Sequence, residues 1–512
     1  MADLNIGREY QDVFDLGGVP AFREFYNVSI FPAKYVYKGY YAPWHLVNAP
    51  TVQNPRNKRK LFHTNIAKAI CAELAGLVWD EQAEVHITTN GAGEEDPLAE
   101  FVQHVLEDNA FFEKMQEHIE QSAALGGGAL KAYVKGEHTD DGIKPGTEEI
   151  CIDYCMADQF VPTAWDNAKV DEAIFVSRKA KGGYYYTKLE WHEWNGDTYV
   201  VRNELFRSQK RDDGQEILGF RYPLNEMYPE LLPEVTINGL NKSLFSYYRT
   251  PIANNVDDNS PLGVSIYGNA MDTLHALDIA FDSFVREFRL GKKKIIVPAA
   301  AISTVVDPTT GELRRFFDPN DEAYEALPMD GDIAPKEAVT TLRVDEHVQA
   351  MNALLSVLCL QVGLSAGTFT FDASNGIRTA TEVISENSKT YKTIRSYQNM
   401  IRPAIERLVD NILELAALYQ IEWNGYNIAS LVAKGYEVSI VMEDAVLEDA
   451  QSKLNRGIML LGNGLLSKKR MMTDPAYGIG MTDEEADKEL EQIANERKAG
   501  AETFDFFSAI RE

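Results

Sequence analysis

The chain has 512 residues and a formal net charge of −28, from 50 Lys or Arg against 78 Asp or Glu. Hydrophobic residues make up 45% and charged residues 25%, which excludes a wholly disordered chain or a collagen-like fibre, and no run approaches the ~18 apolar residues of a membrane-spanning helix. The acidic excess argues against a protein that coats nucleic acid, and only four cysteines disfavour a disulfide scaffold and predict synthesis in a reducing cytoplasm.

The first half of the chain predicts an α+β body that follows an irregular arm. Aromatic and turn-forming residues dominate 1–60, and the helical spacing of apolar residues then predicts helices over 61–78 and 97–125. Further on, apolar residues alternate with polar ones, and the turn Asn195-Gly196-Asp197 predicts a β-hairpin. The strands expected from this alternation cover 129–135, 149–154, 171–178, 184–194 and 197–207. We therefore expect 61–260 to form one α+β domain.

Two helices with heptad spacing are predicted on either side of a small module. Over 261–290 and 344–364, apolar residues recur at alternating intervals of three and four, typical of helices that pack along a narrow seam. The seam residues are Leu274, Leu277, Phe281 and Phe284 in the first helix and Val348, Met351, Leu355 and Leu358 in the second. Between the helices, 291–343 contains the strand pattern Ile295-Ile296-Val297, which predicts a compact α/β module.

The last third of the chain predicts a long helix and a helical tail. A polar, glycine-bearing segment covers 365–378, and helical spacing follows from 379 to about 420. Pro403 lies inside this helix and should kink or divide it. A strand is predicted over 435–442, and 443–512 is expected to be helical and charged.

No motif predicts catalysis, a metal site or a cofactor. Gly126-Gly127-Gly128 lacks the Lys-Ser/Thr pair of a phosphate-binding loop and favours a turn before a strand. Cys151 and Cys155 lack the further ligands of a zinc site and are interpreted as half-buried thiols. We accordingly expect a protein that is not an enzyme.

Two surface features each admit two interpretations. Five cations at one helix end either offset the helix dipole or form a basic band for phosphates or an acidic neighbour; they are Arg286, Arg289, Lys292, Lys293 and Lys294. The polar segment 365–378 carries Thr368, Phe369, Thr370 and Phe371. Its aromatic residues either tuck into a core or project as a contact surface in a channel.

Several short motifs, in their order along the chain, resemble the portal proteins of tailed double-stranded DNA bacteriophages. Ser260-Pro261-Leu262-Gly263-Val264-Ser265 precedes the first heptad helix, and Lys294-Ile295-Ile296-Val297-Pro298 follows it. Gly363-Leu364-Ser365 and then Gly376-Ile377-Arg378-Thr379-Ala380-Thr381-Glu382-Val383 look like the family's second signature. The tail adds Gly464-Leu465-Leu466-Ser467 and Glu484-Glu485-Ala486. The resemblance covers roughly 60–500.

The resemblance implies a ring, usually of twelve subunits, at one capsid vertex, with DNA entering and leaving through its axial channel. Each subunit would have an N-terminal arm and a portal-like architecture. Its parts would be an α/β wing over 61–260, a stem of helices 261–290 and 344–364, a clip over 291–343, a channel loop over 365–378, a long kinked helix returning to the wing over 379–442 and a helical crown over 443–512. An acidic inner wall would keep passing DNA from sticking, because each Lys–phosphate contact adds affinity.

The resemblance also implies partners and a location. The clip, with Arg314 and Arg315 on its surface, would meet the terminase large subunit and later a head-completion or adaptor protein. Major capsid and scaffolding proteins would be further partners, and no cofactor or membrane is involved. The protein would reside in the virion, at the portal vertex of the capsid, after synthesis in the host cytoplasm.

Two other functions stay open at this point. Another capsid connector or minor head protein would share the composition, although it need not have a two-helix stem split by a clip. A cytosolic α+β enzyme belongs to a different class, and the missing nucleophile, metal and phosphate motifs argue against it. A ring of several hundred kilodaltons on a sizing column would exclude a monomeric enzyme.

Overall fold

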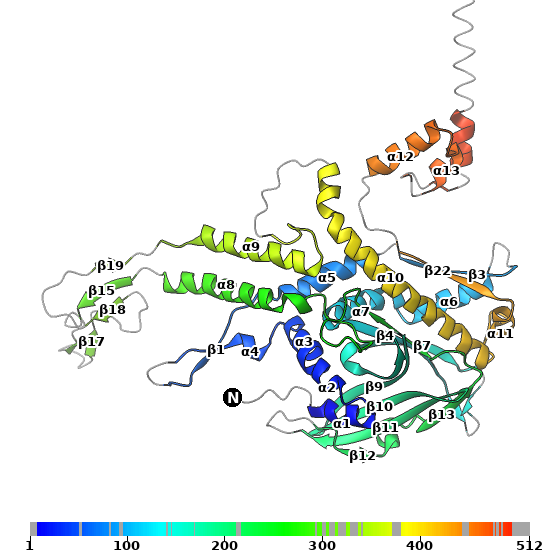
Figure 1. Cartoon of the computed structure of the whole chain (residues 1–512), viewed down its shortest axis with the longest axis horizontal. Coiled ribbons are helices and arrows are strands. Elements are labelled where there is room, and N and C mark those ends of the chain that lie inside the picture. Colours follow the sequence, from blue (N-terminus) through cyan, green and yellow to red (C-terminus); the bar gives the residue numbers. More distant parts are fainter. Residues whose placement is uncertain are drawn as a thin grey trace, which may run out of the picture. The chain divides into compact units, whose positions relative to one another are not determined.

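The computed structural model describes most of the chain and shows a mixture of helices and sheets (Figure 1). The described residues are 8–50, 54–80, 83–91, 96–139, 142–144, 146–167, 169–210, 217–291, 294–298, 304–306, 313–315, 324–327, 336–338, 341–370, 380–442, 450–474, 477, 481–482 and 485–493. The chain forms two compact units, residues 1–376 with 386–443, and residues 377–385 with 444–512. The α+β class predicted from the sequence is confirmed.

The N-terminal segment is helical and buried, so its prediction as an irregular arm was wrong. Its elements are α1 (Arg8–Leu16), α2 (Phe22–Phe25), a π-helical turn (Tyr26–Ile30), α3 (Phe31–Tyr37) and α4 (Ala42–His45). Phe14, Phe25 and Tyr26 are almost completely buried, and the Tyr26 hydroxyl donates to the carbonyl of Phe160 in a distant strand. The aromatic residues form these helices because each buries a large apolar surface against the body of the protein.

The largest sheet is an antiparallel meander. Its strands are β8 (Phe160–Asp166), β9 (Lys169–Lys181), β10 (Tyr184–Asn195), β11 (Thr198–Gln209), β12 (Phe220–Tyr222) and β13 (Glu234–Asn238). The order is β12-β11-β10-β9-β8, with β13 also paired to β11. Asn195 pairs with Thr198, so Gly196 and Asp197 form the two-residue turn that the sequence predicts.

A second sheet has three strands, β14 (Phe245–Arg249), β4 (Gly127–Lys135) and β7 (Glu149–Met156), with β4 in the middle. Helix α7 (Phe111–Leu125) leads into β4 and packs against α5 (Ile66–Val78) and α6 (Pro97–Asp108). Ala110 has a positive φ of 48°, so the stretch predicted as one helix over 97–125 forms two. Gly126 is required because a Cβ there would lie 2.3 Å from the Gly263 carbonyl oxygen.

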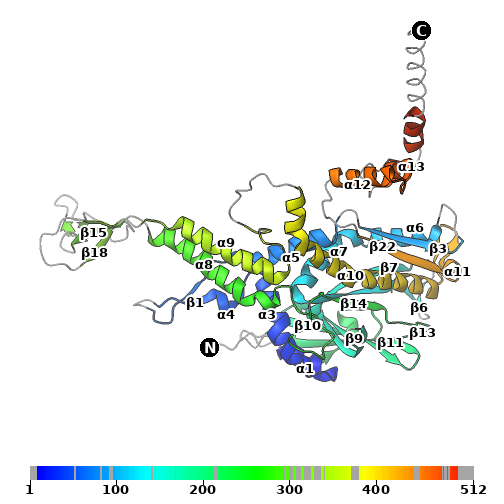
Figure 2. The ribbon, with the colours of Figure 1, turned by 45° about the horizontal axis from the view of Figure 1, so that its top comes forward.

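Two long helices lie side by side, α8 (Met271–Leu290) and α9 (Val344–Val362) (Figure 2). Helix α8 begins ten residues after the predicted start at 261, because Pro261 and Gly263 disfavour a helix. Between them the described residues are strands, so the helical part expected of this module is not found among them. The strands are β15 (Lys294–Pro298), β16 (Thr304–Val306), β17 (Leu313–Arg315), β18 (Tyr324–Leu327) and β19 (Lys336–Ala338).

Helix α10 (Ala380–Leu418) runs for 39 residues. Pro403 does not divide it, since Ile401, Ala404 and Ile405 on either side of the proline are buried in the core. After α11 (Ile428–Val432), strand β22 (Tyr436–Val441) pairs antiparallel with β3 (Glu84–Thr89). The predicted strand over 435–442 therefore forms, and it joins segments about 350 residues apart.

The second unit is helical, as the sequence predicts. It contains α12 (Ala450–Gly462) and α13 (Lys468–Thr473), and residues 485–493 are also helical. The Ser467 side chain caps α13 by accepting a hydrogen bond of 3.1 Å from the Arg470 amide.

Candidate functional site

The first feature of the candidate site is the buried seam between α8 and α9. Leu274 and Leu277 of α8 are buried, and so are Met351, Leu355 and Leu358 of α9. Phe281, Phe284 and Val348 are partly buried and pack at the edge of the same core. Each fully buried side chain of this size contributes about 1.5–3 kcal/mol, so the two seams hold the helices together within one subunit.

A second stripe of α8 is acidic and binds the N-terminal segment. Asp282 accepts two hydrogen bonds from the Arg59 guanidinium, at 2.7 and 2.6 Å, and one of 3.1 Å from the Phe62 amide. Asp278 accepts from the Thr64 amide at 2.9 Å. Burial opposes ionisation of Asp282, but these donors outweigh it and lower its pKa. The sequence analysis missed this contact, although His275, Asp278 and Asp282 share one helical face.

A histidine completes the contact with Asp278. The Tyr41 amide donates to His45 Nδ1 at 2.9 Å, which leaves the ring proton on Nε2. That nitrogen lies 3.1 Å from the Asp278 carboxylate and donates to it. The neighbouring His63 ring stacks on His45 at 4.7 Å, and Trp44 stacks on His275 of α8 at 4.9 Å. The segment before α5 is thus held against α8 by aromatic stacking as well as by ion pairs.

The far ends of the two helices are joined by an ion-paired cluster. Glu287 near the end of α8 accepts from Arg343 Nη2 at 2.8 Å and lies 2.7 Å from His347 Nε2 in α9. The Arg343 amide adds a bond of 3.0 Å to the same carboxylate. The hydrogen bond of the Arg343 side chain, followed by that of His347, lowers the Glu287 pKa to about 2.

The segment after α9 is anchored to α10 as far as the structure describes it. Thr393 Oγ1 donates to the Gly363 carbonyl at 2.6 Å, and Thr390 Oγ1 accepts from the Ser365 amide at 2.9 Å. Phe369 is partly buried against the main core, and Thr368 Oγ1 donates to the Ser365 carbonyl at 2.8 Å. The loop therefore leaves α9 along the surface of α10.

The tip of this loop is only partly described. Thr370 Oγ1 lies 3.4 Å from the Asn352 side chain of α9. Phe371, the other aromatic residue singled out in the sequence, lies outside the described residues.

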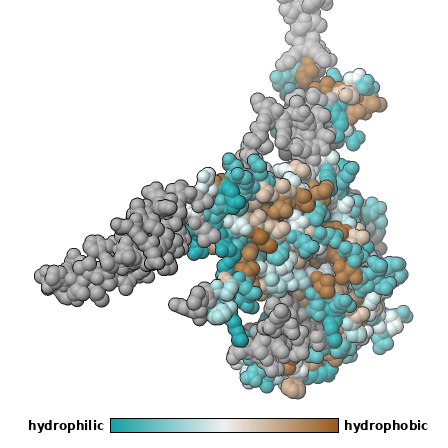
Figure 3. Space-filling model, turned by 60° about the vertical axis from the view of Figure 1, so that its left-hand side comes forward, coloured by the Kyte–Doolittle hydropathy of each residue, from teal (hydrophilic) through white to brown (hydrophobic). Residues whose placement is uncertain are grey.

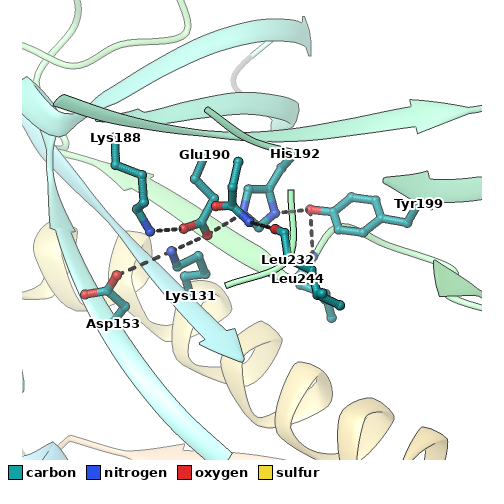
Figure 4. A network of polar contacts seen from close by, with 9 residues as sticks. Lys131, Asp153, Lys188, Glu190, His192, Tyr199, Leu232 and Leu244 are labelled. Carbon is teal, nitrogen blue, oxygen red and sulfur yellow. Dashed lines mark hydrogen bonds and ion pairs between the residues drawn. The ribbon is translucent and has the colours of Figure 1, made fainter. Parts of the chain in front are cut away.

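A buried polar network links the two sheets (Figure 4). Lys131 of β4 donates to Glu190 of β10 at 2.5 Å, and Lys188 donates to the other carboxylate oxygen at 2.6 Å. His192 lies 3.0 Å from Glu190 and 2.7 Å from the Tyr199 hydroxyl. Burial opposes ionisation of Glu190, but the lysines and His192 outweigh it and lower its pKa. No sequence motif indicates this network.

A comparison with protein families identifies the family of this chain. A family model described as phage portal protein, SPP1 Gp6-like, matches residues 30–503. The chain belongs to the phage portal protein family. No curated protein matches it. The resemblance stated from the sequence is thereby confirmed, and the family is one of structural conduits for viral DNA.

The described residues hold neither a candidate metal-binding group nor a candidate membrane-spanning helix. None of the described His, Cys, Asp and Glu side chains gather into a group of three that could hold a metal ion. In the same part of the chain, no helix has the length and apolar character needed to cross a bilayer.

The structure describes only some of the surface residues that the sequence predicts as a basic band and a partner surface. Arg286 and Arg289 are exposed near the end of α8. Lys292 and Lys293 lie outside the described residues, and Lys294 begins β15. Arg314 and Arg315 lie in β17 of the module, opposite Val305 and Thr304 of β16. The basic band and the partner surface of the clip stay predictions.

Proposed function

We propose that this portal subunit forms a closed ring of identical copies, usually twelve in this family, at one capsid vertex. Double-stranded DNA would pass along the ring axis during packaging and ejection. The observation that carries the proposal is the family match over 30–503. It is supported by the pairing of α8 with α9, because a module of strands lies between these two helices in the sequence. The pair corresponds to the stem and 291–343 to the clip.

An exposed stripe on α9 supports a contact between copies. Glu346, Ala350, Ala353, Val357 and Leu360 follow helical spacing on the side opposite the buried seam. Leu360 is 66% exposed and Val357 is 47% exposed. A helix of a soluble subunit usually exposes polar residues to water. Because most residues of this stripe are apolar or small, the stripe is better suited to contact with a neighbouring helix than to exposure to water. Figure 3 shows that apolar side chains also reach the surface elsewhere, in separate patches.

The other parts take roles around this ring. The clip would dock the terminase large subunit and then the head-completion or adaptor protein through Arg314 and Arg315. The wing would meet major capsid and scaffolding proteins, and the loop 365–378 would line the channel. With a net charge of −28, the ring would let DNA slide because few cations bind its phosphates. The protein would act in the virion after synthesis in the host cytoplasm.

The test of ring formation is native mass spectrometry with negative-stain imaging of the purified protein. We expect closed rings from the wild-type chain and loss of rings from Leu360→Glu, whose isolated subunit should still fold because this side chain is exposed within it. Phe220→Glu is the matched control, since Phe220 is exposed on the wing sheet. A monomeric wild-type chain under all conditions would overturn the proposal. Rings from Leu360→Glu would exclude the α9 stripe as the contact.

A further inference from the structure

The N-terminal part of the first unit has an unusual local charge. Residues 25–72 contain seven Lys or Arg and no Asp or Glu, although the whole chain carries −28. This stretch includes a two-stranded ribbon, β1 (Leu46–Asn48) paired antiparallel with β2 (Lys58–Lys60). The ribbon is thus a cationic element in an acidic protein, and a surface of that kind attracts an acidic partner.

The ribbon has an inner and an outer face. Val47 pairs with Arg59, and both are half-buried, with Arg59 bound to Asp282 of α8. Leu46, Lys58 and Lys60 are exposed on the other face. This alternation is the two-residue period of a strand with one face buried. Lys58 and Lys60 therefore lie on the face away from the Arg59–Asp282 ion pair.

Apolar surface adjoins the exposed lysines. The Lys60 Nζ lies 4.7 Å from the centre of the Tyr40 ring, and Lys60 pairs with Leu46 across the ribbon. Tyr40, Leu46 and Phe62 are 37%, 39% and 43% exposed. Exposed aromatic and aliphatic side chains in one group are typical of the apolar centre of a protein–protein contact, and this favours a protein partner over the phosphates of DNA.

The position of the ribbon relative to α8 and α9 indicates that its partner is a second copy of this chain. In both ribbon views the order is ribbon, α8, α9 (Figures 1 and 2), and the contacts of Arg59 and His45 place the ribbon segment on α8. The exposed stripe of α9 faces away from α8. One subunit therefore presents a cationic face at one side of its stem and the α9 stripe at the other. A head-to-tail contact between neighbouring copies joins two such different surfaces, and repetition of it closes a ring.

We propose that the outer face of the ribbon docks on α9 of the next copy in the ring. Lys58 and Lys60 lie against the exposed acids at the start of that helix, Asp345 and Glu346. The apolar group of Tyr40, Leu46 and Phe62, which adjoins these lysines, covers Ala350 and Ala353, one to two turns further along the stripe. The apolar contact supplies affinity, whereas the opposite charges fix the register and suppress other pairings. This inference rests on the proposed ring and names its second surface.

The test is a charge swap followed by the fraction of protein in rings, measured by native mass spectrometry. Lys58→Glu with Lys60→Glu should lower that fraction about tenfold or more at about 0.15 M salt, because like charges then face each other. Adding Asp345→Lys and Glu346→Lys to the same chain should restore it. The control is Lys181→Glu with Lys210→Glu, exposed lysines of the wing sheet, and unfolding temperatures verify that each variant folds.

The outcomes separate this inference from the ring itself. If the wild-type chain forms rings and the Lys58 and Lys60 variant keeps the same ring fraction at low and high salt, the ribbon contact is wrong while the ring stands. Rings at the normal fraction together with reduced DNA retention would assign the ribbon to DNA and also overturn the inference. Loss of rings without rescue by the swap would exclude α9 as its partner.

Discussion

The carboxylate of Asp282 in α8 and the guanidinium of Arg59 in β2 form two parallel hydrogen bonds, at 2.7 and 2.6 Å. The two residues are separated by 223 positions in the sequence, and the Asp282 side chain is almost fully buried. A bidentate pair of this kind is stronger than a single charge-assisted bond and fixes orientation. It positions the N-terminal ribbon against α8, the helix that packs on α9.

Arg59→Gln should lower the free energy of unfolding by about 1.5–3 kcal/mol, the range for hydrogen bonds to charged groups. Asp282→Asn should cost a similar amount, and the double variant should cost less than the sum because both changes remove one interaction. Denaturant unfolding measures these values. Arg56→Gln is the control, since Arg56 is exposed on the same segment. Additive losses would show that the pair does not act as a unit.

The cluster of Glu287, Arg343 and His347, between the end of α8 and the start of α9, predicts a pH dependence. Glu287 has a pKa of about 2 in the folded protein, below the ~4.3 of an unfolded chain. Its contribution to stability is therefore present above the unfolded value and is lost as the pH falls through the folded one. The difference in unfolding free energy between wild type and Arg343→Gln should be constant at neutral pH and shrink toward pH 2. A pH-independent difference would contradict this, and exposed Arg289→Gln is the control.

Removal of Lys131 should destabilise the contact between the two sheets. Lys131→Met leaves the Glu190 carboxylate buried with fewer partners, and breaking a buried ion pair costs about 3–5 kcal/mol. The loss should fall at the lower end, because Lys188 still donates to Glu190. Lys181→Met, at the exposed end of β9, is the matched control. Equal unfolding free energies for the two variants would show that the network contributes nothing.

The loop after α9 should contact DNA weakly. Thr368→Lys with Thr370→Lys adds two phosphate contacts, so DNA passage should slow and become sensitive to salt. The measurement is packaged DNA length and particle yield at two ionic strengths. Lysines at Asn195 of β10 and Thr236 of β13, both exposed on the largest sheet, form the control. Full-length packaging at normal yield with the loop variant would exclude the channel placement.

The module between α8 and α9 should serve partners rather than the ring. Arg314→Glu with Arg315→Glu, in β17, should leave rings intact and abolish DNA packaging, because charge reversal disturbs recognition more than folding. Ring yield and packaged DNA are measured on the same preparation. Arg207→Glu is unsuitable as a control because its guanidinium stacks on Tyr222, whereas exposed Lys181→Glu is suitable. Normal packaging would remove Arg314 and Arg315 from the partner surface.

Local patterns in the sequence predict the long strands, the two heptad helices and the family. Strands β9 to β11 follow from alternating residues and the turn at Gly196, and the α8 and α9 seams follow from heptad spacing, because both patterns arise from local backbone geometry. The order of short motifs along the chain likewise indicates a portal subunit.

The partners of the charged and aromatic residues follow from tertiary contacts that no local pattern predicts. Asp282, Arg59, Lys131 and Glu190 each look like solvated charges in the sequence, and they become partners only when distant segments meet. Phe14, Phe25 and Tyr26 likewise lack a helical period long enough to be recognised, yet their side chains are almost completely buried. Local patterns encode the period of an element, whereas long-range pairing depends on surfaces that exist only after the elements have packed.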